Sequence, residues 1–138
     1  MPSKIKRLPL DHSGMRMSWA KGVIAGDFIF LSGTEGRDPQ TDEIVHGMKA
    51  QCELALIKIK ERLEEMGSDL RSIVSLRIYV TDMDKYFRYE GGWVITKFWK
   101  KYCPEFLDNP PAITLLQVSG LARKEMEIEL EVIAYRGK

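Results

Sequence analysis

Residues 125–134 alternate strictly between two kinds of side chain. The apolar set is Met126, Ile128, Leu130, Val132 and Ala134, and the positions between and before them hold Glu125, Glu127, Glu129, Glu131 and Ile133. Successive side chains of a strand point to opposite faces, so this segment predicts a strand with one face in a core. The other face carries four carboxylates, which repel one another unless water or basic groups lie opposite. Both a solvated face and a wet groove or subunit boundary meet that condition.

Residues 46–66 predict an amphipathic helix. Its apolar positions recur at steps of three and four, at Met48, Cys52, Ala55, Leu56, Ile59, Leu63 and Met66. We expect Lys58, Glu61, Arg62 and Glu65 on the solvent side and a helix end at Gly67. A second helix is expected over about residues 84–102. Gly91 and Gly92 lie inside it, where they mark either a break or a close approach of two backbones.

The remaining segments predict strands. "VIAGDFIFLSG" gives two extended runs around a turn at residues 25–27, and the apolar run Phe28 to Leu31 predicts a strand covered on both faces. Residues 73–80 alternate, with Val74, Leu76, Ile78 and Val80 expected to face inward. Pro110 and Pro111 stiffen the chain just before a strand over residues 112–118.

The order of these elements predicts an α+β fold. A mixed sheet carries two helices on one face, as a two-layer sandwich in a single domain over residues 1–138, with one further strand possible at the N-terminus. The other face of the sheet mixes apolar and charged side chains. That mixture favours burial against another subunit.

Composition excludes several classes of function. The 21 basic and 20 acidic residues nearly cancel, which disfavours nucleic acid as a partner. The two cysteines form no CxxC pair, and no secretory or membrane-spanning segment is found, so we expect a cytoplasmic protein. His12 and His46 lie far apart without carboxylates at ligand spacing, so no metal site is expected. Cys52 lies on the apolar stripe and is expected to be inert.

Four ordered segments resemble one family. "GDFIFLSGTEGRDPQT", "YVTDM", "NPPAITLLQV" and "EIELEVIA" are similar to the RidA/YjgF family of reactive-intermediate deaminases, some of which were formerly labelled translation inhibitors or endoribonuclease L-PSP. The resemblance runs from about Trp19 to Ala134. It implies a chorismate-mutase-like fold, a homotrimer whose sheets line a central barrel, and a small-molecule ligand in clefts between subunits. It also implies that the protein uses no metal and no organic cofactor.

The resemblance also implies a set of site residues. In the family, a glutamate on the last strand holds the water that attacks an imine or enamine carbon, and that glutamate falls on Glu129. The segment after the third apolar strand falls on Ser32, Gly33 and Thr34, and an aromatic cleft wall falls on Trp19. A cleft asparagine of close relatives falls on Glu90. The arginine that binds the substrate carboxylate falls on Ile113, followed by Thr114 and Leu115.

Isoleucine at position 113 changes the expected ligand. An aliphatic side chain cannot replace the planar fork that arginine offers to a carboxylate. Glu90 beside Glu129 would make the cleft still more acidic, so a neutral or cationic amine, imine or amide is expected, unless Arg16 or Arg37 restores the positive charge. Three functions follow: a hydrolytic deaminase using Glu129, a non-catalytic module that binds a metabolite or regulates a partner, and an RNA-directed role that the neutral charge disfavours.

Overall fold

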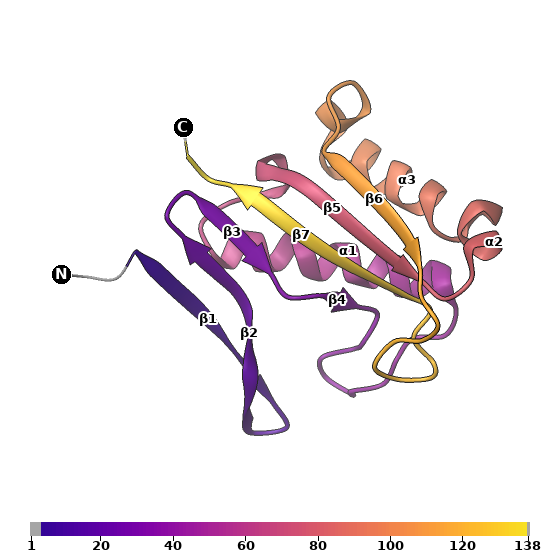
Figure 1. Ribbon diagram of the computed structural model, residues 1–138, viewed down its shortest axis with the longest axis horizontal. Coiled ribbons are helices and arrows are strands. Elements are labelled where there is room, and N and C mark those ends of the chain that lie inside the picture. Colours follow the sequence, from indigo (N-terminus) through magenta and orange to yellow (C-terminus); the bar gives the residue numbers. More distant parts are fainter. Residues whose placement is uncertain (1–3, 138) are drawn as a thin grey trace.

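The computed structural model describes residues 4–137 and forms one sheet with helices on one side (Figure 1). The strands are β1 (Ile5–His12), β2 (Met15–Ala25), β3 (Phe28–Leu31), β4 (Thr34–Glu35), β5 (Ile73–Val80), β6 (Ala112–Gln117) and β7 (Ile128–Tyr135). The helical segments are α1 (Met48–Glu65), η1 (Leu70–Ser72), α2 (Met83–Lys85), the π-helix η2 (Tyr86–Glu90), α3 (Gly92–Tyr102) and η3 (Pro104–Leu107).

The sheet is mixed, as the sequence predicts. Its strand order is β1-β2-β3-β7-β5-β6, and β4 pairs with β7 beyond the end of β3. All pairs are antiparallel except β5–β6. The chain between these two parallel strands passes through α2, η2 and α3, which is the crossover that a parallel pair requires. The expected N-terminal strand is present as β1.

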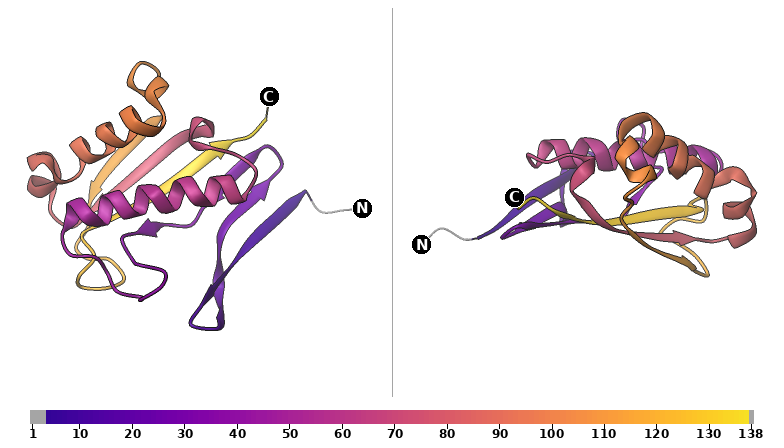
Figure 2. Two further views of the ribbon diagram at one scale, coloured as in Figure 1. Left: turned by 180° about the vertical axis from the view of Figure 1, so that it is seen from behind. Right: turned by 90° about the horizontal axis from the view of Figure 1, so that it is seen from above.

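The two long helices cover the same face of the sheet (Figure 2). The apolar stripe of α1 and the inward side chains of β5 and β7 form the core, which includes Leu56, Leu63, Leu76, Ile78 and Leu130. The α+β two-layer prediction is therefore confirmed. The far part of the β1–β2 hairpin extends beyond the helices, so it leaves one end of the sheet uncovered (Figure 2).

Two details of the strand predictions were wrong. Val74 is exposed and Ile73 is buried in its place, because a β-bulge shifts the register between Ile73 and Ser75. Phe28 and Phe30 are 42% and 44% exposed, so only one face of β3 is covered within the chain. A continuous apolar run does not say what covers its second face.

The second helix is broken where the glycine pair lies. The predicted helix over 84–102 is divided into α2, η2 and α3, with Gly91 at φ −135° and ψ −77° between the last two. A Cβ atom on Gly91 would overlap the ring of Tyr86. The glycine pair therefore marks a break, and the close approach at Gly91 is to the side chain of Tyr86 rather than to a second backbone.

Candidate functional site

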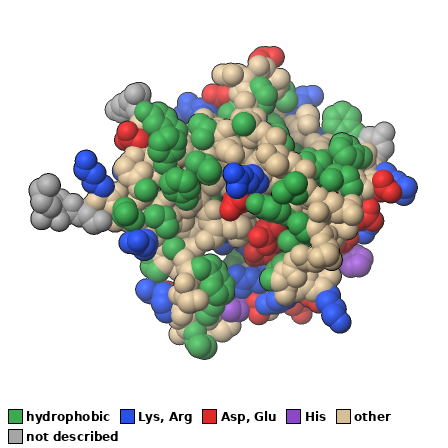
Figure 3. Space-filling model, in the orientation of Figure 1, with side chains coloured by type: hydrophobic (Ala, Val, Ile, Leu, Met, Phe, Trp, Pro, Cys, Tyr) green, Lys and Arg blue, Asp and Glu red, His purple; other side chains and the backbone are tan. Residues whose placement is uncertain are grey.

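A cavity of about 260 Å³ lies between the β1–β2 hairpin and the segment that follows β3. Trp19 of β2 lines one side and is 54% exposed, and Ser32, Gly33, Glu35 and Arg37 are among the other lining residues. Figure 3 shows this face of the molecule hollowed beside the hairpin, with basic side chains near the hollow. An aromatic surface together with a few convergent polar groups is typical of a small-molecule site.

Backbone contacts fix the wall formed by Ser32 and Gly33. Ser32 N donates a hydrogen bond to the carbonyl oxygen of Lys21 at 3.0 Å, and Ser32 Oγ donates to the carbonyl oxygen of Ala20 at 2.5 Å. These bonds hold the end of β3 against β2. A Cβ atom on Gly33 would overlap the carboxylate of Glu129, so that carboxylate lies directly against the Gly33 backbone.

Glu129 is positioned by the sheet. It lies on β7 between Glu35 of β4 and Tyr79 of β5, on the face opposite to the helices. Burial raises the pKa of the Glu129 carboxyl, and the negative charges of Glu35 and Glu131 raise it further, while Lys58 lowers it. A carboxylate whose pKa is raised accepts a proton more readily than an ordinary carboxylate, which suits a group that accepts and returns a proton.

Two carboxylates of this acidic segment, Glu131 on β7 and Glu127 just before it, have basic or hydroxyl partners. Tyr79 Oη donates to Glu131 Oε1 at 2.9 Å, and Lys85 Nζ donates to Glu127. The acidic face of this strand is therefore neutralised in part by neighbouring side chains. These contacts relieve the repulsion that four carboxylates in a row predict.

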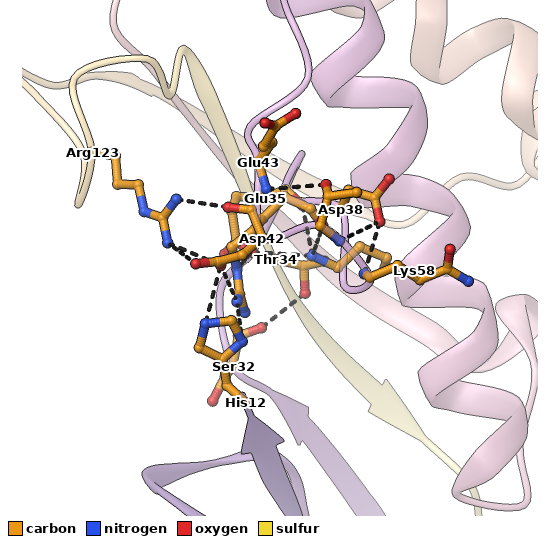
Figure 4. A network of polar contacts seen from close by, with 12 residues as sticks. His12, Ser32, Thr34, Glu35, Asp38, Asp42, Glu43, Lys58 and Arg123 are labelled. Carbon is orange, nitrogen blue, oxygen red and sulfur yellow. Dashed lines mark hydrogen bonds and ion pairs between the residues drawn. The ribbon is translucent and has the colours of Figure 1, made fainter. Parts of the chain in front are cut away.

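A buried polar network lies behind the cavity (Figure 4). Lys58 Nζ of α1 donates to the carbonyl oxygens of Glu35 and Arg37 at 3.0 Å each and to Glu35 Oε1 at 3.1 Å. Arg62, one turn further along α1, donates through Nη1 to Thr34 Oγ1 at 2.9 Å. The network fixes β4 against the helix and holds Glu35 close to Glu129.

The sequence analysis missed this network. It placed Lys58 and Arg62 on the solvent side of the helix, and both are buried. Gln51, Ala55, Lys58 and Arg62 follow one another at steps of four, three and four, which is the spacing of a helix face. That spacing was the available signal, but it was hidden because two of the four residues are charged.

A second cluster joins the hairpin to the loops beside the cavity. Asp42 lies 3.0 Å from Arg37 Nη1, 3.0 Å from Arg123 Nη2 and 3.1 Å from His12 Nε2 (Figure 4). The Arg37 guanidinium, followed by Arg123, holds the pKa of the Asp42 carboxyl at about 2. Asp42 therefore stays ionised and links three segments that are distant in the sequence.

The predicted site residues fall into two groups within one chain. Trp19, Ser32 and Gly33 line the cavity with Glu129 beside it, whereas the Thr34 side chain is buried and serves as the acceptor for Arg62.

The second group is Glu90, Ile113, Thr114 and Leu115. Glu90 ends η2, where its charge acts on Lys85, and it is not among the groups that shift the pKa of Glu129. Ile113 lies on the edge strand β6 and is 49% exposed. Ile113 pairs with Leu76, so its side chain lies on the helix side of the sheet. It is two strands and three residue positions away from Glu129, a separation of roughly 14 Å measured diagonally across the sheet.

No metal site is formed by the part of the chain that the structure describes. Within residues 4–137, no three His, Cys, Asp or Glu side chains gather closely enough to hold an ion. Within the same range, no helix is both long and apolar enough to cross a membrane.

Comparison with known proteins identifies the family. Residues 13–136 match the family described as Endoribonuclease L-PSP. A RutC family protein of Pyrococcus abyssi is 33% identical over 119 residues, which cover 86% of this chain and 86% of that protein. The chain belongs to the RidA/YjgF family. Another family relative, the human 2-iminobutanoate/2-iminopropanoate deaminase, is 28% identical over 120 residues, covering 86% of this chain and 80% of the human protein.

Solved structures of the RidA/YjgF family share this fold. Escherichia coli TdcF, crystallised with bound serine, is 25% identical with a TM-score of 0.80, covering 96% of this chain and all of TdcF. The Escherichia coli YjgF gene product is 24% identical with a TM-score of 0.77, covering 99% of this chain and all of YjgF. The likeness covers the sheet and both long helices.

Proposed function

We propose that this RidA/YjgF family protein is a hydrolytic deaminase of a small imine or enamine, in which Glu129 orients the attacking water. The observation that carries the proposal is the Glu129 carboxyl, which lies against Gly33 beside the cavity with a raised pKa. The name of the human relative, 2-iminobutanoate/2-iminopropanoate deaminase, supports the same class of reaction.

The chemistry needs only positioning and proton transfer. Water adds its oxygen to the carbon of the C=N bond while Glu129 accepts a proton from it. Glu129 returns this proton to the nitrogen, and the proton of the new hydroxyl group is then transferred to the nitrogen as well, so the C–N bond breaks, the carbonyl forms and ammonia leaves with both hydrogens of the water. No electron is gained or lost, so the proposed reaction needs no redox cofactor.

The proposed catalytic unit is a homotrimer. Ile113, Thr114 and Leu115 lie on β6, two strands away from Glu129 on β7, and Ile113 is on the other face of the sheet. A neighbouring subunit that brings its β6 edge to the hairpin cavity supplies them. The exposed aromatic side chains of β3 on the open sheet face support such an assembly, because burial of apolar surface is its main driving force.

Substitution at Glu129 tests the reaction. Ammonia release from a panel of freshly generated small imines is expected to fall by about 10²- to 10⁴-fold in Glu129→Gln, because the amide cannot accept the proton. Glu131→Gln is the matched control, since Glu131 lies on the same face of β7 two residues along. It should remain within a few-fold of wild type. Wild-type rates in Glu129→Gln would reject the assignment.

The second candidate function is a binding module in the same cavity. Ile113 favours it, because an aliphatic residue at this position removes the family's carboxylate contact. By itself, Ile113 predicts a ligand without a free carboxylate. Saturable binding of the imines' stable analogues without any ammonia release would identify a binding module. Ammonia release that depends on Glu129 would exclude it.

A further inference from the structure

A separate cavity, called here the helix groove, lies between α1 and α3. The two helices pack side by side on the face of the sheet opposite to Glu129 (Figure 2). The groove has a volume of about 540 Å³, which is within the range of small-molecule sites in proteins. It shares no lining residue with the hairpin cavity. The helix groove is therefore distinct from the proposed reaction site.

The apolar lining of the helix groove is largely aromatic. Its buried part consists of Val94 and Phe98, together with the half-buried Ile57. Its exposed part consists of Trp93 and Tyr102, which are 50% and 39% exposed. The rings of Phe98 and Tyr102 lie 4.7 Å apart between centroids, so the aromatic surface extends along α3. Such a surface offers a large contact area to a flat apolar group.

The polar lining of the helix groove is mainly cationic. Lys97 and Lys101 follow Trp93 at steps of four, so these side chains share one stripe of α3. Lys49 of α1 also lines the groove. None of the three lysines lies within 4.0 Å of a carboxylate oxygen of residues 4–137. Lys101 Nζ lies 5.2 Å from the centre of the Tyr102 ring, and this cation–π contact keeps its charge at the groove.

The charges of the lining do not cancel. Glu53 is its acidic member, and three lysines against one glutamate leave an excess of two positive charges at neutral pH. Residues 92–102 of α3 contain no Asp or Glu that could reduce this excess. The whole chain has a net charge of only +1, so the groove is more basic than the protein that carries it. A ligand with two negative charges complements it.

We propose that the helix groove binds a small aromatic dianion, with its ring against Trp93 and Phe98 and its charge among the lysines. Lysine ammonium groups bind phosphate as compact point charges, and a phosphomonoester carries close to two negative charges above pH 7. This site goes beyond the proposed deaminase. In the proposed homotrimer the sheets line the barrel, so the helix groove of each subunit stays open to solvent.

Three probes test the proposal. Calorimetry compares the binding of 1-naphthyl phosphate, 1-naphthol and inorganic phosphate at about pH 7.5 and a constant ionic strength of about 0.15 M. Wild type should bind naphthyl phosphate about tenfold or more tightly than either of the others, because only this probe carries both the ring and the charge. Naphthyl phosphate that binds no more tightly than naphthol, or than inorganic phosphate, overturns the proposal.

The indole N–H signals of tryptophan locate the bound probe. Trp93 lines the helix groove, Trp19 lines the hairpin cavity and Trp99 is buried. These signals are assigned in heteronuclear NMR spectra with single Trp→Phe variants. Naphthyl phosphate should shift the Trp93 signal at concentrations that leave the Trp19 signal unchanged. Binding that leaves Trp93 unshifted, or that shifts Trp19 more than Trp93, overturns the site.

Charge variants of α3 separate the groove from general electrostatic attraction. Lys97→Met and Lys101→Met should each weaken the binding of naphthyl phosphate by about fivefold and leave that of naphthol unchanged. Lys100→Met is the matched control, because Lys100 is exposed on the same helix but does not line the groove. It should bind as wild type does. Equal losses in all three variants would show that only net charge matters and would reject the site.

A gain of affinity gives a readout that misfolding cannot imitate. Glu53→Gln removes the negative charge of the lining, so it should tighten the binding of naphthyl phosphate by about threefold. Glu61→Gln removes the same charge from an exposed position of α1 outside the groove and should have no effect. Unchanged or weaker binding in Glu53→Gln contradicts the proposal. Ammonia release is not measured in any of these experiments, so the helix groove and the deaminase stand or fall separately.

Discussion

At the scale of single residues, Glu129 is placed at a cost to stability. Burial is the main cause that raises the pKa of the Glu129 carboxyl in the folded protein above its ordinary value. The folded protein therefore binds the proton more tightly than the unfolded chain, and ionisation at neutral pH works against folding. We expect Glu129→Gln to raise the Tm at pH 7 by a few degrees while it removes activity.

The sign of this effect can be tested through the pH dependence of the difference in Tm between wild type and Glu129→Gln. Well below pH 4.5 the carboxyl is protonated in both states, so wild type and Glu129→Gln should unfold alike. The advantage of Gln should grow as the pH rises through the folded pKa of Glu129 and then stay constant. Thermal unfolding from about pH 3 to pH 8 measures this difference. A difference that is largest at the acidic end would show that the sign is wrong.

Cys52 has the properties of a core residue rather than a reactive thiol. Its side chain is fully buried in α1, and burial raises its pKa to about 12. We expect Cys52→Ala to lower the free energy of unfolding by about 1 kcal/mol or more through lost packing, with activity unchanged. Denaturant unfolding measures the loss. Rapid alkylation of Cys52 by iodoacetamide in the native protein would contradict this interpretation.

At the scale of elements, the break before α3 depends on a single glycine. Gly91→Ala places a methyl group in the ring of Tyr86, so we expect a loss of about 1–3 kcal/mol from overpacking. Gly92→Ala is the matched control, because its Cβ atom would lie 3.5 Å from Tyr86 Cε1 within the first turn of α3. That change should be neutral or stabilise by up to about 1 kcal/mol. Equal losses in denaturant unfolding would reject the packing argument.

At the scale of the whole molecule, the open sheet face predicts assembly. Phe28 and Phe30 lie 6.4 Å apart, and Phe28 contacts Tyr135 at 5.2 Å between ring centroids, all on exposed positions. Light scattering should give three times the 15.9 kDa mass of the chain. Phe30→Lys should shift this toward smaller species, because each buried phenylalanine contributes about 1.5–3 kcal/mol.

A control on another surface makes the assembly test specific. Leu107 of η3 is exposed to a similar degree as Phe30 but does not belong to the sheet. Leu107→Lys should keep the mass of wild type. A wild-type mass of 15.9 kDa at micromolar concentration, or equal effects of the two substitutions, would reject the proposed trimer.

The sequence by itself determined the strand β7, the helix α1 and the family. Alternation and helical spacing indicate which side of a strand or helix is apolar, and the ordered motifs indicate the family to which the chain belongs. The break at Gly91 was also predicted from the sequence. Glycine destabilises a helix, so it is expected inside a helical segment where the backbone conformation or a close contact requires it. The family resemblance predicts Trp19, Ser32, Gly33 and Glu129 in one site, and the first three line one cavity with Glu129 beside it.

Only the tertiary structure showed that the charged residues Lys58 and Arg62 of α1 are buried. Lys58 and Arg62 look solvent-facing in a helical pattern, because the pattern cannot show that β4 supplies carbonyl and hydroxyl oxygens to receive them. Likewise, the family resemblance assigns Ile113 and Glu129 to one cleft, but within one chain the sheet separates them by two strands and by its two faces. Burial of a charge depends on partners from distant segments, and periodicity within one segment carries no record of them.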